Sequence, residues 1–313
     1  MALAGRPASS SFYEPSRTNH QGLAYHSAVS MQPTATPRSI LAETGSPYHR
    51  VGGYHEYAPP LDLADAVEAL WTYETVGIRL VVHRVVPDAA VSLCFMGTRA
   101  SDGSAGASRL RVIGPISAPK LFAPGPGHSM ASIRVKLEWC RPLLGVAPWE
   151  HASGEPCYAD IRPDLAVPLE EQLMRTTEPV DALRLLVTFL RERRAARLRH
   201  GTARAAAVLL RVSMESLRLG ACAPRVATLA RQLGVTDRHL RRLMVDETGI
   251  APRHFARIQR FHALLRAADL APRPAWATLA ALHGYADQSH LIREVQDLAG
   301  VTPARLHAER VAE

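Results

Sequence analysis

Side chains able to read DNA bases occur in two short stretches near the C-terminal end of the chain. Arginine can donate two hydrogen bonds to guanine, glutamine can pair with adenine, and serine can bond to several bases. The candidates for base contacts are Arg238, Arg241, Arg242, Gln288, Ser289 and Arg293. Candidates for contacts to the flanking phosphates are Thr236, His239, His290 and Arg257. These side chains can bind one DNA duplex only if the helices or loops that carry them expose them on the same side of the protein.

Both stretches belong to an internal repeat, a feature that decides the architecture of a chain. Residues 227–230 and residues 277–280 share the sequence Ala-Thr-Leu-Ala at an offset of fifty positions. The offset becomes 51 farther along, so one residue has been added in the second copy. The matched positions include Gly234 with Gly284, Leu240 with Leu291, Gly249 with Gly300 and Pro252 with Pro303.

Each copy has the order of elements expected for a helix-turn-helix unit. In the first copy a short apolar helix precedes Gly234, where glycine can adopt a left-handed turn without a clash. Thr236 can then cap the amides that open the second helix, and Asp287 can do so in the second copy. Gly249 can end the second helix before Pro252 starts the next one. The repeat therefore predicts two such units in tandem.

Helical phase predicts which side chains of each second helix face outward. In the first copy the inward positions are Leu240, Leu243 and Met244, and the outward positions are Arg238, Arg241, Arg242 and Val245. In the second copy the inward positions are Leu291, Val295 and Leu298, and the outward ones are Ser289, Ile292 and Arg293, with Gln288 at the rim. A single outward arginine is more often a plain surface charge. Two such faces on one repeated scaffold favour DNA binding.

The repeat resembles the paired DNA-binding units of the AraC/XylS family of transcription regulators. The resemblance rests on the stretches LARQLGVTDRHLRRLMVDETGIAPRHFARIQR and LAALHGYADQSHLIREVQDLAGVTPARL, of which the Gly-Val-Thr-Pro fragment at 300–303 is the most specific. It assigns base reading to the same six side chains. It also implies that a helix from about Pro252 to Ala268 is a rigid spacer, which sets two recognition helices into successive major grooves about 34 Å apart.

Three residues depart from the family pattern. Met244 and Val295 stand where an aromatic residue is usual, and acidic Glu294 stands where neutral or basic residues are common. These departures predict slightly weaker core packing and weaker DNA binding by the second unit.

The rest of the chain divides into three segments. Residues 1–50 are rich in Ser, Pro, Thr and His and predict a disordered leader, with Met31 as an alternative start. Residues 54–175 contain short apolar runs at 78–86, 91–95, 110–113 and 133–137, which predict a β-rich domain. The resemblance to the AraC/XylS family implies that this domain senses a small molecule or mediates dimerisation. Residues 180–220 have a helical period and many arginines, which predicts a basic linker or a direct DNA contact.

The expected fold is therefore α+β. A β-rich N-terminal domain precedes an all-α C-terminal domain at residues 221–308, in which a long helix joins two helix-turn-helix units. Fragments of the N-terminal domain, including residues 86–88 and 142–146, resemble an uncharacterised domain found on some family members.

Composition narrows the function further. The net charge of +8 and the pI near 9.7 suit binding to nucleic acid or to an anionic surface. The four cysteines form no CxxC pair, and neither a GxSxG elbow nor a phosphate-binding loop is present, so we expect no metal, cofactor or catalytic residue. The lack of a long apolar run and of a signal peptide predicts a cytoplasmic protein that does not contact a membrane.

Three functions remain after this reading. The first is a transcription regulator that binds a promoter and is modulated through its N-terminal domain. Its expected partners are double-stranded DNA, a small-molecule effector, RNA polymerase and a second copy of the chain. The second is a regulator without an effector. The third is a DNA-repair-like enzyme with the same DNA-binding region, which would need a cysteine cluster near its N-terminus.

Overall fold

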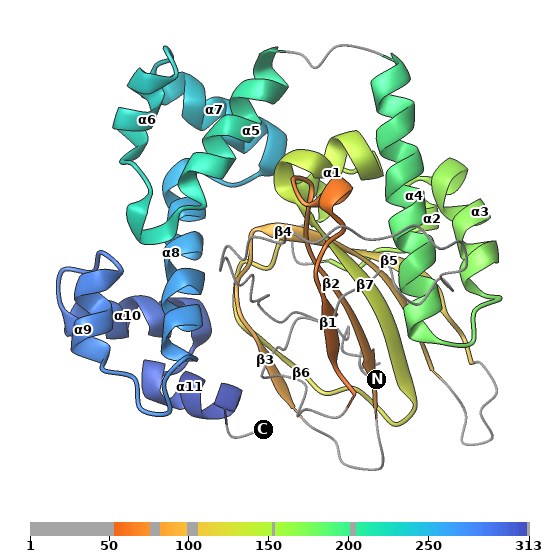
Figure 1. Cartoon of the computed structure of the whole chain (residues 1–313), viewed down its shortest axis with the longest axis horizontal. Coiled ribbons are helices and arrows are strands. Elements are labelled where there is room, and N and C mark those ends of the chain that lie inside the picture. Colours follow the sequence, from red (N-terminus) through yellow and green to blue (C-terminus); the bar gives the residue numbers. More distant parts are fainter. Residues whose placement is uncertain (1–52, 76–81, 99–105, 152–153, 201–204, 312–313) are drawn as a thin grey trace, which may run out of the picture.

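The computed structural model has a β-rich N-terminal part and a helical C-terminal part (Figure 1), which confirms the α+β expectation. It describes residues 53–75, 82–98, 106–151, 154–200 and 205–311. The predicted leader at residues 1–50, including Met31, lies outside the described residues.

The N-terminal part is built on a five-stranded antiparallel sheet with the strand order β1-β2-β7-β4-β5. Its strands are β1 (His55–Tyr57), β2 (Val67–Glu74), β4 (Ala90–Thr98), β5 (Arg109–Ile113) and β7 (His128–Lys136). Ile133 on the central strand β7 lies opposite Leu70 of β2 and Leu93 of β4. A second sheet of two strands is formed by β3 (His83–Val85) and β6 (Lys120–Phe122).

Both faces of the five-stranded sheet are buried. Side chains alternate between the faces along each strand. Leu93 and Ile133 lie in one apolar core, whereas Trp71, Cys94 and Met130 lie in another. Because neither face is left to solvent, β4 reads as an almost continuous apolar run rather than as an alternating one.

The strands extend beyond most of the apolar runs that predicted them. The runs at 91–95 and 110–113 fall inside β4 and β5, and the run at 133–137 forms the end of β7 before helix α1 begins at Leu137. Only residues 83–85 of the run at 78–86 form a described strand. The strand β2, with Trp71 at its centre, was not predicted because its apolar residues are interrupted by Glu68 and Thr72.

Helix α4 (Pro179–His200) covers the sheet face that carries Ile133 (Figure 1). Its apolar stripe, Leu183, Leu186, Val187 and Leu190, is buried in the same core. Its arginines pair with the N-terminal part, because Arg191 contacts Asp62 at 2.7 Å and Arg194 contacts Asp65 at 2.5 Å. The helix therefore belongs to the β-rich part, whereas the sequence predicted a linker over 180–220.

Three shorter helices and two 3-10 helices complete the described N-terminal part. The helices are α1 (Leu137–Leu144), α2 (Tyr158–Ile161) and α3 (Pro163–Leu173), and the 3-10 helices are η3 (Leu61–Leu63) and η4 (Pro148–His151). The buried hydroxyl of Tyr158 donates a hydrogen bond to the carbonyl of Leu144 at 2.6 Å, which ties α2 to the end of α1.

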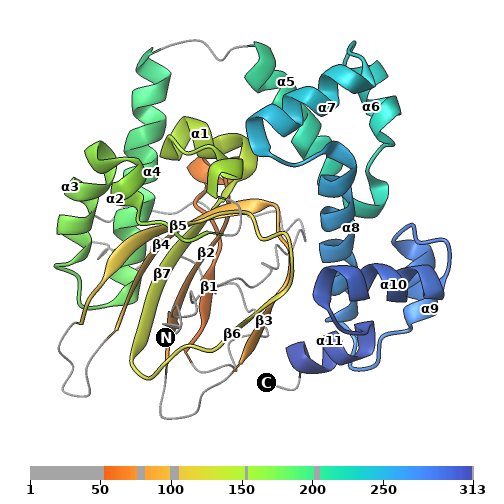
Figure 2. The ribbon, with the colours of Figure 1, turned by 180° about the vertical axis from the view of Figure 1, so that it is seen from behind.

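The C-terminal part consists of two helical units joined by α8, as the sequence predicted. Its helices are α5 (Ala205–Leu217), α6 (Val226–Gln232), α7 (Asp237–Thr248), α8 (Pro252–Ala268), α9 (Trp276–Leu282), α10 (Gln288–Ala299) and α11 (Pro303–Val311). The first unit is α6 with α7 and the second is α9 with α10. Figures 1 and 2 show both units on the side of the sheet away from α4.

Helix α8 runs through both apolar cores. Phe255 and Ile258 lie in the core that contains α4 and the first unit. Phe261 and Leu264 lie in the core that contains Trp71 and the second unit. The helical units are therefore packed against the sheet and do not form a separate globule.

Polar contacts also join the N-terminal part to the C-terminal part, and two of them involve Arg218 and His262. Arg218, which follows α5, donates to Glu138 of α1 at 2.6 Å and lies over the ring of Phe255. His262 of α8 lies 2.9 Å from the carbonyl oxygen of Pro87 through its Nε2 atom. Breaking a buried ion pair such as the first costs about 3–5 kcal/mol, so the two parts are firmly joined.

We expect His262 to make the stability of the protein sensitive to acid. Burial lowers the pKa of His262 to about 3, whereas an unfolded histidine has a pKa of about 6.5. Between these values the unfolded chain binds the extra proton, so stability is lost as the pH falls below about 6.5. At pH 5.5 the loss from this one group is about 1.4 kcal/mol.

The measurement is urea unfolding of the wild type and of His262→Gln at pH 7.5 and 5.5. The variant keeps a donor for Pro87 and should lose about 1.4 kcal/mol less than the wild type on acidification. The comparison removes the contribution of Asp88, whose pKa burial raises to about 7 and which acts in the opposite direction. Equal losses in the two proteins would show that His262 is not the group that titrates.

Candidate nucleic-acid interface

The first helical unit has the turn and the caps that its sequence predicted. Gly234 has a φ of 68°, in the left-handed region that glycine adopts easily. The hydroxyl of Thr236 accepts a hydrogen bond from the amide of His239 at 3.1 Å, which caps α7. Gly249 ends α7 with a φ of 75°. The start and the end of α7 are thus confirmed.

Helix α7 turns its arginines to solvent. Leu240 and Met244 are fully buried, so the opposite face is fixed by the 3.6-residue period. Arg238, Arg241, Arg242 and Val245 are exposed, in agreement with the predicted phase. Among the described residues, none of the three arginines is part of an ion pair. Their donors are therefore available to an acceptor outside the chain.

The second unit repeats this arrangement with fewer charges. Asp287 accepts a hydrogen bond from the amide of His290 at 2.7 Å and caps α10. Leu291, Val295 and Leu298 are buried as predicted. Gln288, Ser289 and Arg293 are exposed, and Ile292 is half-buried. The six predicted base-reading side chains thus lie in two sets, one on each of two equivalent helices.

The four residues predicted to contact phosphates differ in their exposure and in their partners within the protein. His239 is exposed, and Thr236 uses its hydroxyl as the helix cap. His290 is half-buried, where its Nδ1 accepts from the amide of Ala286 at 3.2 Å. Arg257 is paired with Asp297 at 2.9 Å. His290 and Arg257 would therefore have to share or leave these protein contacts to reach a phosphate.

Glu294 points into the protein and away from the exposed face of α10. Its side chain is 8 % exposed and accepts from Arg260 of α8 at 2.8 Å. It also lies 3.5 Å from Arg257 and 3.6 Å from His290. Arg260 in turn lies over the ring of Tyr285, whose pKa burial raises to about 12. Glu294 therefore fastens the second unit to α8, and its charge is balanced within the protein.

A cleft lined by arginines lies between the two units, and the sequence did not reveal it. Its volume is about 580 Å³, and its lining includes Arg225, Arg253, Arg257, Arg260 and His283. Arg225 and Arg253 are exposed. Each follows a proline, Pro224 or Pro252, at the start of a helix, and this repeated Pro-Arg pair is the sequence signal that could have identified them. Cations in this position suit the backbone of a duplex that crosses from one unit to the other.

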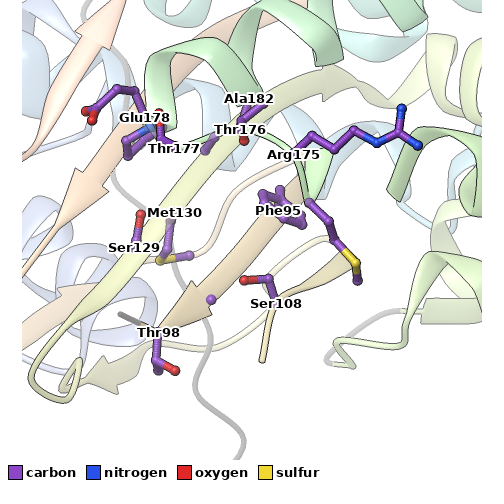
Figure 3. A pocket seen from close by; sticks show the side chains of 14 residues that line it. Phe95, Thr98, Ser108, Ser129, Met130, Arg175, Thr176, Thr177, Glu178 and Ala182 are labelled. Atoms are coloured by element: carbon purple, nitrogen blue, oxygen red, sulfur yellow. The ribbon is translucent and has the colours of Figure 1, made fainter. Parts of the chain in front are cut away.

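A small pocket lies in the N-terminal part, between the sheet and the connection from α3 to α4. Its volume is about 240 Å³. The floor of the pocket is formed by Phe95 of β4 and Ala131 of β7. Figure 3 shows Phe95 near the hydroxyl group of Ser108, with Ser129 on β7 and Thr176 on the opposite wall. The pocket thus combines an apolar floor with several hydroxyl groups that can orient a small molecule.

The described residues contain no group of three His, Cys, Asp or Glu side chains placed to hold a metal ion. Cys94 and Cys140 are buried, and burial raises the pKa of both thiols. Cys157 is half-buried and Cys222 is exposed.

Two family models match separate segments of the chain. Residues 229–309 match a helix-turn-helix domain. Residues 55–152 match a domain of unknown function, DUF6597. No match was found among the curated proteins. Within the described residues, no helix is both long enough and apolar enough to cross a membrane.

The solved structures that match the chain include those of ToxT from Vibrio cholerae. The structure from strain O395 has a TM-score of 0.37 and 10% sequence identity, and the match covers 75% of this chain and 98% of ToxT. The structure of wild-type ToxT with a bound unsaturated fatty acid, from strain SCE256, has a TM-score of 0.39 and 9% identity, over 78% and 95% of the two chains.

We expect Arg242→Ala to weaken binding to the preferred duplex by about 1–3 kcal/mol and to relax specificity at one base pair. The reason is the loss of two hydrogen bonds to one base from an unpaired, exposed arginine. The measurement is the affinity for the preferred duplex and for single-base variants of it. Arg273→Ala, in the exposed connection before α9, is the control with the same change of charge. Equal weakening on every sequence would instead make Arg242 a phosphate contact.

Proposed function

We propose that this chain is a sequence-specific transcription regulator that reads two successive major grooves. Its C-terminal residues form a helix-turn-helix domain of the AraC type, which follows a domain of unknown function along the chain. The observation that carries the proposal is the pair of equivalent helices, α7 and α10. Each presents exposed base-reading side chains to solvent, and two of the three on each helix, Arg238 with Ser289 and Arg242 with Arg293, occupy matching positions of the repeat. We refer to α7 and α10 as the recognition helices.

The scaffold supports binding by both recognition helices at once. Helix α8 joins the two units and is embedded in both apolar cores, so it acts as a stiff spacer. A duplex presents equivalent major-groove surfaces about 34 Å apart on one face. The arginine-lined cleft between the units suits the backbone segment between these grooves, where cations would supply affinity without sequence preference.

The two units are expected to contribute unequally. Helix α7 presents three arginines, whereas α10 presents Gln288, Ser289 and one arginine. The greater positive charge of α7 favours phosphate attraction and guanine contacts, and α10 is better suited to a mixed sequence. A motif with a strongly specified half and a weakly specified half would follow from this difference.

The test is selection of bound sequences from a random duplex pool by the full-length protein at near-physiological salt. We expect an enriched motif with two halves about one helical turn apart. The variant Arg238→Ala/Arg242→Ala should erase the preference in one half and leave the other. Binding that depends strongly on salt and selects no sequence would contradict the proposal.

We also propose that the N-terminal part modulates DNA binding by taking up a small molecule in the pocket of Figure 3. Phe95 and Ala131 on its floor belong to β4 and β7, and other residues of these two strands lie in the apolar cores that also contain the helical units. A molecule of modest size with both apolar and hydroxyl-bonding groups fits this lining.

A thermal-shift screen with a metabolite library tests this part of the proposal, because a ligand that binds only the native state raises the unfolding temperature. A compound that stabilises the wild type should lose its effect in Ser129→Leu, which fills the pocket. It should keep its effect in Thr188→Leu, on the exposed face of α4. No stabilising compound, or one that acts equally on both variants, would favour a regulator without an effector at this site.

Contacts with RNA polymerase and with a second copy of the chain belong to the same proposal. A DNA-repair-like enzyme is the alternative from a different class. Its cysteine chemistry would need an activated thiolate, whereas Cys94 and Cys140 are buried with raised thiol pKa values.

A further inference from the structure

The N-terminal part touches both recognition helices at the same position of the repeat. That position is the glycine that ends each helix, Gly249 in α7 and Gly300 in α10. A methyl group added to Gly249 would lie 2.5 Å from the Cβ atom of Trp149 in η4. One added to Gly300 would lie 3.5 Å from Pro119 and 3.8 Å from Arg84. The C-terminal ends of α7 and α10 therefore both pack against the N-terminal part.

Arg84 of β3 makes the polar contact at the second of these ends. Its Nη1 atom donates to the carbonyl oxygen of Ala299, the last residue of α10, at 3.2 Å. Its Nε atom donates to Glu309 of α11 at 2.7 Å. The last carbonyls of a helix lack partners within the helix, and a cation beside them is also favoured by the helix dipole. The Nη2 atom of Arg84 donates to the other carboxylate oxygen of Glu309 at 3.4 Å, so all three guanidinium nitrogens of Arg84 join α10 and α11 to the two-stranded sheet.

The strength of this contact follows from its surroundings. The Arg84 side chain is only 15 % exposed, and the pair with Glu309 holds the pKa of that carboxyl below its ordinary value. An ion pair that is shielded from water and held in a fixed geometry contributes more than a typical surface pair does.

The first unit is held by the same N-terminal part through different residues. Arg141 of α1 pairs with Glu247 of α7 at 3.4 Å, and Trp149 of η4 lies against Gly249 at the end of α7. Among the described residues, Arg84 takes part in neither of these contacts. A change at Arg84 can therefore loosen the second unit while the first keeps its own attachment.

We propose that Arg84 is a positioning residue for DNA recognition. It fixes the orientation of α10 relative to α7, so that both helices meet successive grooves without further rearrangement. Two linked binding units gain affinity through their effective concentration, which falls when the second unit is free to turn. This inference rests on the proposed function, and it adds a residue remote from the base-reading faces to the determinants of operator spacing.

The experiment compares full-length wild type with Arg84→Met, which keeps the length of the side chain and removes its donors. The control is Arg109→Met, which makes the same change at an exposed residue of the edge strand β5. Affinity is measured for the selected two-half duplex, for the same duplex with the second half scrambled, and for duplexes with one or two base pairs added between the halves.

We expect Arg84→Met to bind the intact duplex about tenfold more weakly. Its affinity for the duplex with only the first half should not change, and it should discriminate less between spacings. Arg84→Lys should fall between the two proteins, because it retains the charge without the paired geometry. Glu309→Gln should also discriminate less between spacings than the wild type does. If Arg84→Met does not fold, Arg84→Lys and Glu309→Gln test the inference in its place.

Three results would overturn the inference. Unchanged affinity and spacing preference would show that Arg84 does not position α10. Tighter binding by Arg84→Met would show that the contact restrains the units from DNA. An equal loss on the half-site duplex would make Arg84 a purely structural residue. A wild type that selects no sequence would overturn the proposed function itself, and this inference with it.

Discussion

Burial of both faces of the five-stranded sheet is the constraint on which the rest of the structure depends. One face is covered by α4 and α1, and its core continues into the first helical unit. The core of the other face contains the two-stranded sheet and continues into the second unit. A sheet buried on both faces cannot tolerate the loss of either cover, because its apolar residues would meet water. The DNA-binding units are therefore part of the folded body to which the sheet belongs.

This arrangement couples the two parts of the molecule physically. Helix α8 places Phe255 in one core and Phe261 in the other. A change in packing on either face of the sheet therefore affects the helix that joins the two units. Packed interfaces respond to small displacements by shifting between discrete arrangements rather than by bending continuously. The proposed uptake of a small molecule by the N-terminal part would act through this packing.

The arginines of the described residues include two groups, those paired with carboxylates within the protein and those exposed on the outward face of α7. Several arginines at contacts between elements, such as Arg194, Arg218 and Arg260, are paired with carboxylates. The arginines on the outward face of α7 are not paired within the described residues. A high arginine content alone could not separate these two uses, because the difference lies in whether a carboxylate from a distant segment reaches each guanidinium.

The sequence by itself determined the local structure of the DNA-binding domain. The repeat, the helical period, the capping residues Thr236 and Asp287 and the glycines that end the helices depend on neighbours within a few residues, so their spacing predicts their structure. Only the tertiary structure decided that α4 covers the sheet, that Glu294 turns inward, that Arg257 is paired with Asp297, and that Arg84 reaches the end of α10. Arg84 and Ala299 are 215 residues apart in the chain. Contacts of this kind depend on which surfaces meet when the chain folds, and no local pattern records them.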